Sequence, residues 1–273
     1  MTDNPYRLLV VDIDGTLLGK DGSISAEDRD AVARVRRSGI PVSLSTGRVA
    51  QACLKILDLL ELDGYHIFAD GALVYNPETG REVYAEPISR EMVRQIVDYA
   101  HREGITFDLY SVSHFFIERE TWATDIRQKF FGLTPTIIDF TDLWRNEQII
   151  KGTLVVRSPE EKAKANDFYR HFKDRLDLSW TETPAFPDVD FINVLSPGVS
   201  KGKALEALTG FLKIPLDAVM AIGDGANDAP ALSRAGLAVA MGNAPDELRA
   251  VASHVTLDVE HNGVAAAIKK FLL

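Results

Sequence analysis

The sequence has one cysteine, Cys53, and no long hydrophobic run. A single cysteine excludes an internal disulfide, so we expect a reducing, cytoplasmic environment. No stretch of 18 apolar residues occurs, and the segment MTDNPYR at the N-terminus has an early acid and a proline where a secretory signal would have bases and an apolar core. These absences predict a protein that neither enters nor crosses a membrane.

Basic residues are outnumbered by acidic ones. The 273 residues include 30 Lys and Arg against 40 Asp and Glu, which gives a net charge of −10. This charge repels nucleic acid and anionic membranes unless a local basic patch reverses it. The densest basic segment, RVRR at 34–37, lacks interleaved aromatic residues, and we interpret it as the solvated face of a helix. No nucleic-acid partner is expected.

Strand and helix patterns alternate at both ends of the chain. RLLVV, PVSLST and YHIFAD have the composition of strands, and helical patterns over 24–39 and 49–60 separate them. The alternation resumes at Lys201 with KGKALEALTGFL, AVMAIGD, NDAPALSRA, LAVAM and NGVAAAIKKFL. Such alternation predicts an α/β domain with a parallel sheet that helices cover on both faces.

The middle of the chain has a different pattern. ALVYN and REVYA predict a hairpin, and residues 89–104 have the apolar spacing of a helix. Paired strand patterns and a second helix follow, with apolar and polar residues alternating. We predict a discontinuous core domain at 1–83 and 194–273, with an inserted α+β domain at 84–193 that has an open sheet.

Acidic residues follow two of the predicted core strands. Asp12 and Asp14 come directly after RLLVV, and Asp224 ends AVMAIGD, shortly before Asp228. Neighbouring carboxylates repel each other by several kcal/mol at an effective dielectric constant of about 20, unless a cation or a proton lies between them. If both strand ends adjoin in a parallel sheet, the acids form an oxygen-rich site for Mg²⁺.

Other residues suit a phosphate beside this metal. SLSTGR places Ser45, Thr46 and Gly47 between a strand and a helix, where a hydroxyl and free N–H groups can bind an anion. Lys201, in GVSKGKAL, adds a positive charge near another helix start. A carboxylate nucleophile, a metal, a lysine and an anion site are the parts of phosphoryl transfer through an aspartyl phosphate.

Four segments, in the order DIDGT, STGR, SKG and GDGANDAPAL, resemble the four motifs of the haloacid dehalogenase (HAD) superfamily of phosphohydrolases. The long insertion between the second and third motifs, with DGALVYN, MGNA and NGVAAAI, is similar to the Cof-type subfamily (subfamily IIB). The resemblance implies a Rossmann-like α/β core with a parallel sheet and an inserted α+β cap of the C2 type, which has an open-faced sheet.

The resemblance also implies roles for individual residues. Asp12 would attack phosphorus, and Asp14 would protonate the leaving alcohol and then activate water. The implied phosphate-binding residues are Thr46, Gly47, Arg48, Lys201 and Asn227. The implied Mg²⁺ ligands are Asp12, Asp14 through its main-chain carbonyl, Asp224 and Asp228.

One position departs from the subfamily pattern. The sequence has Asp70-Gly71-Ala72 where the subfamily usually has Asn-Gly-Ala. The change replaces an amide, which can donate and accept, by a carboxylate that only accepts. The sequence alone assigns no role to Asp70.

The function that we predict is Mg²⁺-dependent hydrolysis of small phosphate monoesters, with sugar phosphates as the first expectation. A phosphomutase acting on hexose phosphates is the alternative. A cation-pumping ATPase shares a similar GDGxNDxPAL segment, but it has threonine two residues after the nucleophile, where this chain has Asp14. A phosphate sensor without turnover would not need the Asp12 and Asp14 pair. We expect a small phosphorylated metabolite as partner, and a monomer or a weak homo-oligomer.

Overall fold

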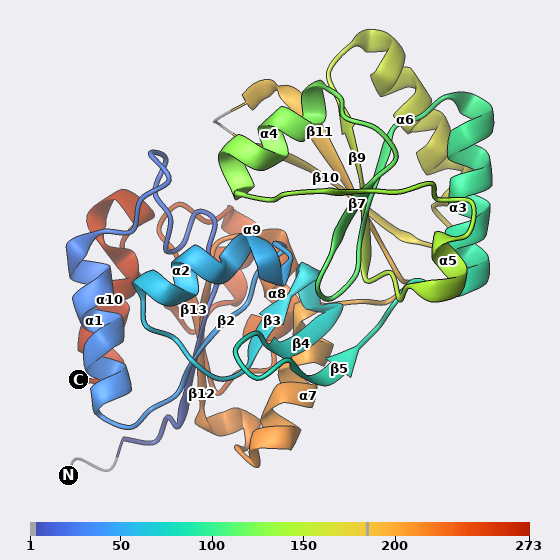
Figure 1. Ribbon diagram of the computed structural model, residues 1–273. Helices are drawn as coiled ribbons and strands as arrows, with labels where there is room; N and C mark the ends of the chain where they lie inside the picture. Colours follow the sequence, from blue (N-terminus) through green and yellow to red (C-terminus); the bar gives the residue numbers. More distant parts are fainter. Residues whose placement is uncertain (1–3, 184–185) are drawn as a thin grey trace. The chain divides into compact units, whose positions relative to one another are not determined.

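The computed structural model describes residues 4–183 and 186–273, which fold as two compact units (Figure 1). The first unit comprises Met1–Arg48, Cys53–Tyr84 and Ser200–Leu273, of which residues 1–3 lie outside the described part. The second comprises Val49–Ala52 and Ala85–Val199. The predicted boundary at 193/194 falls inside a strand, β11 (Phe186–Leu195), and the second unit keeps this strand whole.

The first unit is built on a five-stranded sheet with the strand order β14-β13-β12-β1-β2. All four neighbouring pairs are parallel. The strands are β1 (Leu8–Val11), β2 (Val42–Leu44), β12 (Val219–Gly223), β13 (Leu237–Ala240) and β14 (His254–Val255). Every residue of β1, β2, β12 and β13 is buried, which is the pattern of a sheet covered on both faces.

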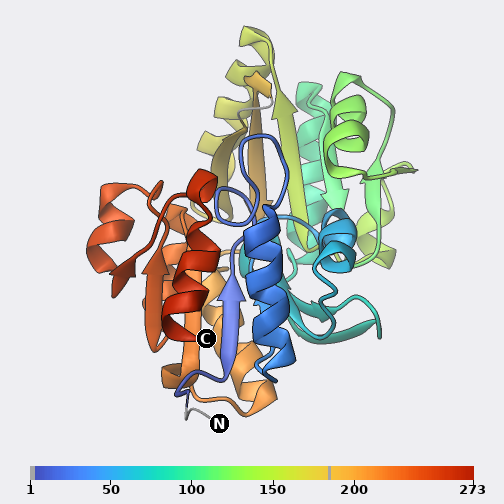
Figure 2. The same ribbon diagram turned by 90° about the vertical axis from the view of Figure 1, so that its left-hand side faces the viewer.

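Helices lie on both faces of this sheet. α1 and α10 pack against each other on one face, as both views show (Figures 1 and 2). Residues of α7, α8 and α9 form a hydrophobic core with β1, β12 and β13 on the other face. The helices are α1 (Ala26–Arg37), α2 (Leu54–Leu59), α7 (Lys201–Leu212), α8 (Ala229–Leu232), α9 (Asp246–Val251) and α10 (Gly263–Phe271). Short 3₁₀ helices are η1 (Ala50–Cys53), η2 (Ala69–Gly71), η3 (Leu216–Ala218), η4 (Ala226–Asp228) and η5 (Val259–His261).

The sheet register brings three strand ends to one level. Val11, the last residue of β1, pairs with Ile222 of β12 and with Leu44 of β2. The chain therefore leaves all three strands at the same edge of the sheet. In parallel α/β sheets this carboxyl edge is where ligands bind.

The third predicted strand of the core does not join the parallel sheet as a full strand. β3 (His66–Phe68) shares one parallel bridge with the segment after β2, between Ile67 and Ser45, and pairs antiparallel with β4 (Leu73–Asn76). With β5 (Arg81–Ala85) these strands form a separate three-stranded sheet. The predicted hairpin is therefore confirmed as β4 and β5, and β3 lies on the other side of β4 in the same sheet.

The second unit contains a six-stranded sheet with the order β10-β11-β9-β6-β7-β8. Neighbouring strands are antiparallel except β7 and β8, which are parallel. Besides β11, the strands are β6 (Phe107–Tyr110), β7 (Phe115–Ile117), β8 (Thr136–Ile137), β9 (Lys151–Val156) and β10 (Asp177–Thr183). The predicted α/β core with an α+β insertion is therefore confirmed.

The two faces of the second sheet are covered differently. α3 (Arg90–Glu103), α5 (Leu143–Asn146) and α6 (Pro159–Phe172) bury one face. The other face carries α4 (Trp122–Phe131) and the Val49–Ala52 segment, and leaves Ser179 and Thr181 of β10 exposed. On this second face only the edge strand β10 is left open, so the predicted open-faced sheet holds for that strand and not for the whole face.

The sequence analysis missed the helix α4. Thr121 caps it, its side chain accepts a hydrogen bond from the backbone N–H of Ala123, and Thr124 bonds back to the backbone N–H of Thr121. Gly132 ends the helix with φ 67°. These capping residues mark both ends of the helix in the sequence. The apolar pattern between them is too short to predict a helix by itself.

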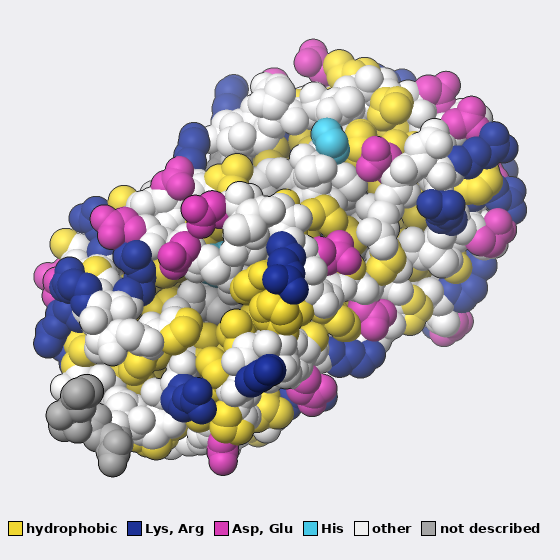
Figure 3. Space-filling view, turned by 60° about the horizontal axis from the view of Figure 1, so that its bottom comes forward, with side chains coloured by type: hydrophobic (Ala, Val, Ile, Leu, Met, Phe, Trp, Pro, Cys, Tyr) yellow, Lys and Arg dark blue, Asp and Glu magenta, His cyan; other side chains and the backbone are white. Residues whose placement is uncertain are grey.

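Charges of both signs are interspersed on the face drawn in Figure 3, where Lys and Arg side chains alternate with Asp and Glu. No broad basic surface lies on this face, in agreement with the net charge. Within residues 4–183 and 186–273, none of the helices has the length and apolar character needed to cross a bilayer.

Candidate active site

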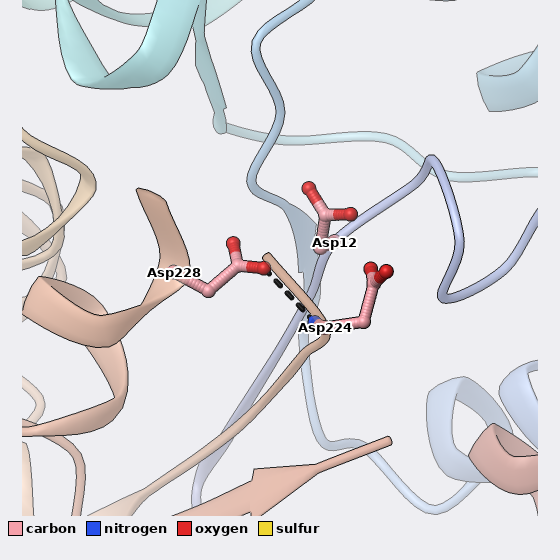
Figure 4. Close-up of side chains that lie close together, drawn as sticks. All are labelled: Asp12, Asp224 and Asp228. Atoms are coloured by element: carbon pink, nitrogen blue, oxygen red, sulfur yellow. Dashed lines mark hydrogen bonds between the residues drawn. The ribbon is translucent and has the colours of Figure 1, made fainter. Parts of the chain in front are cut away.

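Three carboxylates converge at the carboxyl edge of the first sheet (Figure 4). Asp12 follows β1, Asp224 follows β12, and Asp228 lies in η4, one turn further along the chain. Each offers an oxygen within 4.8 Å of an oxygen of the other two. The sequence prediction that Asp12 and Asp224 meet at one edge is borne out by this geometry, which the register of β1 with β12 imposes.

Lys201 lies among these acids. It is the first residue of α7, it is 1% exposed, and its Nζ donates to Asp12 Oδ1 at 2.7 Å and to Asp228 Oδ1 at 2.6 Å. One ammonium group thus faces two buried carboxylates, with Asp224 as a third acid close by. The cluster retains an excess of negative charge when all four groups are ionised.

The pKa values of the cluster reflect this imbalance. Burial, followed by the Asp228 carboxylate, raises the pKa of Asp12 well above its usual range, although Lys201 opposes the shift. Burial also raises the pKa of Asp224 to about 6 against the hydrogen bond from Thr16. Burial alone would lower the pKa of Lys201, but the carboxylates of Asp12 and Asp228 outweigh it and raise the pKa.

Asp228 organises the loop after β12. Its Oδ2 accepts hydrogen bonds from the backbone N–H groups of Asp224 at 3.0 Å and Gly225 at 2.8 Å, the first of which is drawn in Figure 4. A side chain at Gly223 would collide with the Asp228 carboxylate, so this approach requires glycine. Asp228 therefore fixes both Asp224 and Lys201.

Two residues that the sequence analysis did not single out orient Asp224. The buried Thr16 hydroxyl donates to Asp224 Oδ1 at 2.7 Å, and the Asn243 amide donates to Asp224 Oδ2 at 3.2 Å and to the carbonyl of Gly15 at 2.9 Å. Gly15 has φ 80°, and a Cβ there would overlap the Asp224 carboxylate. Thr16 lies in the motif DIDGT and Asn243 in the motif MGNA, so the sequence contained both residues within recognised motifs. It did not show that they contact Asp224.

The Asp14 side chain is not part of the three-carboxylate cluster, although the sequence analysis placed it there with Asp12 and Asp224. Its two oxygens accept hydrogen bonds from Arg48, from Nε at 2.8 Å and from Nη2. The Asp14 side chain is 56% exposed, whereas that of Arg48 is 10% exposed. Arg48 therefore holds the Asp14 carboxylate in an exposed position. Of the Asp14 atoms, only the main-chain carbonyl remains a predicted metal ligand.

Thr46 and Gly47 form the loop after β2. Thr46 is fully buried, and its Oγ1 accepts a hydrogen bond from the backbone N–H of Arg48 at 3.1 Å, so its hydroxyl hydrogen remains able to donate. Gly47 lies directly against the carboxylate of Asp70. The predicted phosphate-binding loop thus has a buried hydroxyl donor at its base.

Asn227 and Asp70 meet from distant parts of the chain. The Asn227 amide donates to Asp70 Oδ1 at 2.8 Å. The structure thus brings Asn227 beside the Thr46–Arg48 loop through Asp70, whose backbone N–H donates to the Thr46 carbonyl at 3.0 Å.

The acidic cluster fits a hard divalent cation. Its ligand atoms are all carboxylate oxygens, which Mg²⁺ and Ca²⁺ prefer over nitrogen or sulfur. Burial, and after it repulsion between the neighbouring carboxylates, raises the pKa values of Asp12 and Asp224, and a bound cation would offset both effects. Asp12, Asp224 and Asp228 are the side chains suited to hold the ion.

Comparisons with known proteins show the family of this chain. A family model described as haloacid dehalogenase-like hydrolase matches residues 9–268. Phosphatase YwpJ of Bacillus subtilis is 29% identical over 97% of this chain and 100% of its own. The 5-amino-6-(5-phospho-D-ribitylamino)uracil phosphatase YcsE of the same organism is 28% identical over 99% of this chain and 98% of its own.

A solved structure shares the whole architecture. The crystal structure of TM0651 from Thermotoga maritima superimposes with a TM-score of 0.86 and 25% identity, covering 98% of both chains. The match spans both units of this protein, as does the family model. The chain therefore belongs to the haloacid dehalogenase-like hydrolase family.

Proposed function

We propose that this protein is a Mg²⁺-dependent phosphatase that hydrolyses small phosphate monoesters through a phosphoenzyme on Asp12. The observation that carries the proposal is the buried contact of Lys201 with both Asp12 and Asp228, beside Asp224. A structural ion pair would balance its charges, whereas this cluster has three acids for one base. A bound cation would compensate the surplus negative charge of the cluster, and it would also attract the negatively charged phosphate.

Asp12 is the proposed nucleophile. Lys201 donates a hydrogen bond to Asp12 Oδ1 and so fixes the orientation of the carboxylate. Asp12 directly follows β1, so the strand fixes the position of its backbone. An oxygen of Asp12 attacks phosphorus, the bond to the alcohol oxygen breaks, and an aspartyl phosphate forms. Asp12, Asp224, Asp228 and the Asp14 carbonyl would hold Mg²⁺, which when bound supplies positive charge that offsets the charge of the phosphoryl oxygens.

Asp14 is the proposed acid and base. It would give its proton to the leaving alcohol oxygen and then take a proton from the water that attacks the phosphoenzyme, so that Asp12 is regenerated and inorganic phosphate leaves. Arg48 holds both Asp14 oxygens, and Asp14 must exchange at least one of these bonds for the leaving group. The exposure of the Asp14 side chain leaves room for that exchange.

The phosphoryl oxygens are proposed to lie between Thr46, Gly47, Lys201 and Asn227. Thr46 offers a hydroxyl, Lys201 a charge and Asn227 an amide, so each supplies a donor to an anion. These donors belong to the carboxyl edge of one sheet and to the helix start that Lys201 occupies. They are fixed before substrate arrives, which is the condition for stabilising charge in a transition state.

We propose sugar phosphates and related polyol phosphates as the substrate class. The relative named as a phosphatase of 5-amino-6-(5-phospho-D-ribitylamino)uracil has, by that name, a substrate in which the phosphate esterifies a ribityl chain. The donors described above bind the phosphoryl group and not the alcohol, so they suit many such esters. A panel of phosphorylated metabolites ranked by kcat/KM would identify the preferred one.

The test is hydrolysis of p-nitrophenyl phosphate and of hexose phosphates with and without Mg²⁺. We expect release of inorganic phosphate that EDTA abolishes and Mg²⁺ restores. A phosphomutase would instead give an isomeric ester without free phosphate, which separates the two functions. Asp14→Asn should still bind inorganic phosphate but lose turnover by orders of magnitude; near-normal turnover in that variant would refute the acid and base role.

A further inference from the structure

The turn Ala69–Gly71 contains three successive residues with positive φ. The values are 50° for Ala69, 56° for Asp70 and 99° for Gly71. Glycine adopts such angles freely and aspartate tolerates them, but alanine does so only at a cost in conformational energy. Such a turn forms only where contacts with neighbouring segments stabilise it, so those contacts indicate its function.

Two backbone hydrogen bonds hold the turn against the loop after β2. The N–H of Ala69 donates to the carbonyl of Arg48 at 2.9 Å, and the N–H of Asp70 donates to the carbonyl of Thr46 at 3.0 Å. A Cβ on Gly47 would lie 2.8 Å from Asp70 Oδ1, so the carboxylate is pressed against that residue. The turn therefore sets the position of the proposed phosphate loop.

The other side of the turn packs on the start of α7. A Cβ on Gly71 would overlap the carbonyl of Ser200 and lie 2.7 Å from the backbone nitrogen of Lys201. Ser200 caps α7, and Lys201 is its first residue. The turn thus lies between the Thr46–Arg48 loop and the residue that contacts Asp12.

The side chain of Asp70 reaches a third segment. Its Oδ1 accepts the hydrogen bond from Asn227 Nδ2 at 2.8 Å. A carboxylate only accepts hydrogen bonds, so the Asn227 carboxamide is fixed with its NH₂ group toward Asp70. An asparagine at position 70 could donate as well as accept and would permit either orientation of the Asn227 amide.

We propose that Asp70 is a positioning residue for the phosphate site. It fixes the Asn227 amide so that the second hydrogen of Nδ2 is available to a phosphoryl oxygen, and its turn keeps Thr46 and Lys201 at their spacing. The proposal rests on the phosphatase function proposed above. It assigns Asp70 no contact with the substrate: the side chain acts through Asn227, and the backbone of the turn acts through its bond to Thr46.

A double-mutant cycle tests the proposal, with Asp70→Gly, Asn227→Ala and the two combined. Glycine removes the carboxylate and accepts φ 56° without strain, so Tm should stay near that of the wild type. We expect Asp70→Gly to lower kcat/KM for p-nitrophenyl phosphate about tenfold or more, the range of a hydrogen bond to a charged group. The inhibition constant of inorganic phosphate should rise in parallel.

The double variant should be no worse than Asn227→Ala alone, because Asp70 then has no amide left to position. Asp70→Asn serves as the matched control, since it keeps an oxygen acceptor and tolerates the backbone angles. We expect it to retain part of the activity that Asp70→Gly loses, because it keeps an acceptor for Asn227 but fixes the orientation of that amide less strictly. A purely structural role would instead lower Tm and give no such recovery in the affinity for inorganic phosphate.

Three results would overturn the proposal: wild-type kcat/KM and phosphate inhibition in Asp70→Gly, no effect of Asn227→Ala, or additive losses in the double variant. A failure of the phosphatase function has a different signature, since the wild type itself would then release no phosphate. In that case the rise in Tm that inorganic phosphate causes in the wild type and in Asp70→Gly still tests the positioning, and equal rises would contradict it.

Discussion

Each unit of the protein buries an ion pair, and the two pairs differ in their balance of charge. In the second unit, Arg127 Nε donates to Asp108 Oδ2 at 3.1 Å, and both side chains are at most 7% exposed. The ring of Phe191 lies 4.9 Å from the Arg127 guanidinium carbon. One cation faces one anion among aromatic rings, so the pair itself is neutral, although Arg127 Nη2 has no hydrogen-bond partner among the described residues.

In the first unit, Lys201 faces Asp12 and Asp228, with Asp224 close by. The net charge of a buried ionic group therefore distinguishes a pair that only stabilises the fold from a cluster that binds a ligand. A buried pair that is neutral as a whole needs no further ion in the folded chain, whereas a buried cluster with surplus acid needs a cation to balance its charge. Four predictions test this contrast, in order of decreasing effect.

The largest effect is expected for Asp12→Asn. The amide cannot form the phosphoenzyme, so kcat for p-nitrophenyl phosphate should fall by about three orders of magnitude or more. The metal-free variant should unfold at the same temperature as the wild type or higher, because one of the mutually repelling carboxylates is gone while Asp228 still pairs with Lys201. Activity assays and thermal unfolding in EDTA measure both, and a marked loss of Tm would contradict the contrast.

Arg127→Met should show the opposite pattern. It leaves Asp108 buried without its partner, which we expect to cost about 3–5 kcal/mol of unfolding free energy. Urea unfolding measures the loss, and turnover should persist where the variant is folded. Adding Asp108→Asn should restore part of the stability; a double variant no more stable than Arg127→Met would show that the charge is not the cause.

A buried neutral group sharpens the comparison. His66 is fully buried, its Nδ1 accepts from the backbone N–H of Leu44 at 3.1 Å, and burial lowers its pKa from 6.5 to about 4. Between these values the unfolded chain binds a proton that the folded chain does not. Stability conferred by neutral His66 is therefore full above about pH 6.5 and is lost as the pH falls toward 4, by about 3 kcal/mol at most.

His66→Asn is the matched variant, because its side-chain oxygen can accept from Leu44. We expect its unfolding free energy to fall less than that of the wild type between pH 6.5 and 4, as urea unfolding at several pH values would measure. Parallel curves for the two proteins would show that His66 does not titrate in this way.

The smallest effect is stabilisation by Mg²⁺. At a free concentration of about 100 times Kd, binding to the folded state alone adds about 2.7 kcal/mol. The ligands must be ionised, so the rise in Tm should shrink as the pH falls through about 6, the pKa to which burial raises Asp224. Asp224→Asn should weaken the rise, and Asp30→Asn, an exposed acid on α1, should not. Equal rises in all three proteins would place the ion elsewhere.

Much of the site was predictable because its residues follow strands. A buried apolar strand that ends in aspartate indicates both the strand and the side chain at its carboxyl edge, so Asp12 and Asp224 could each be placed at a strand end. That the two ends adjoin was only a condition of the prediction, and the pairing of β1 with β12 meets it. The order of DIDGT, STGR, SKG and GDGANDAPAL also identified the family. The same local patterns gave the parallel sheet and the inserted α+β unit.

What the sequence determined by itself is therefore most of the strands and helices, though not α4, and the chemistry at the strand ends, because each depends on neighbouring residues. The tertiary structure decided the rest: β3 leaves the main sheet, Arg48 holds Asp14, and Asn227 meets Asp70 across 157 positions of sequence. The link from Asn243 to Gly15 spans 228 positions. Such contacts follow from the way that strands pair and helices pack, and no local pattern encodes which distant partner a polar side chain will find.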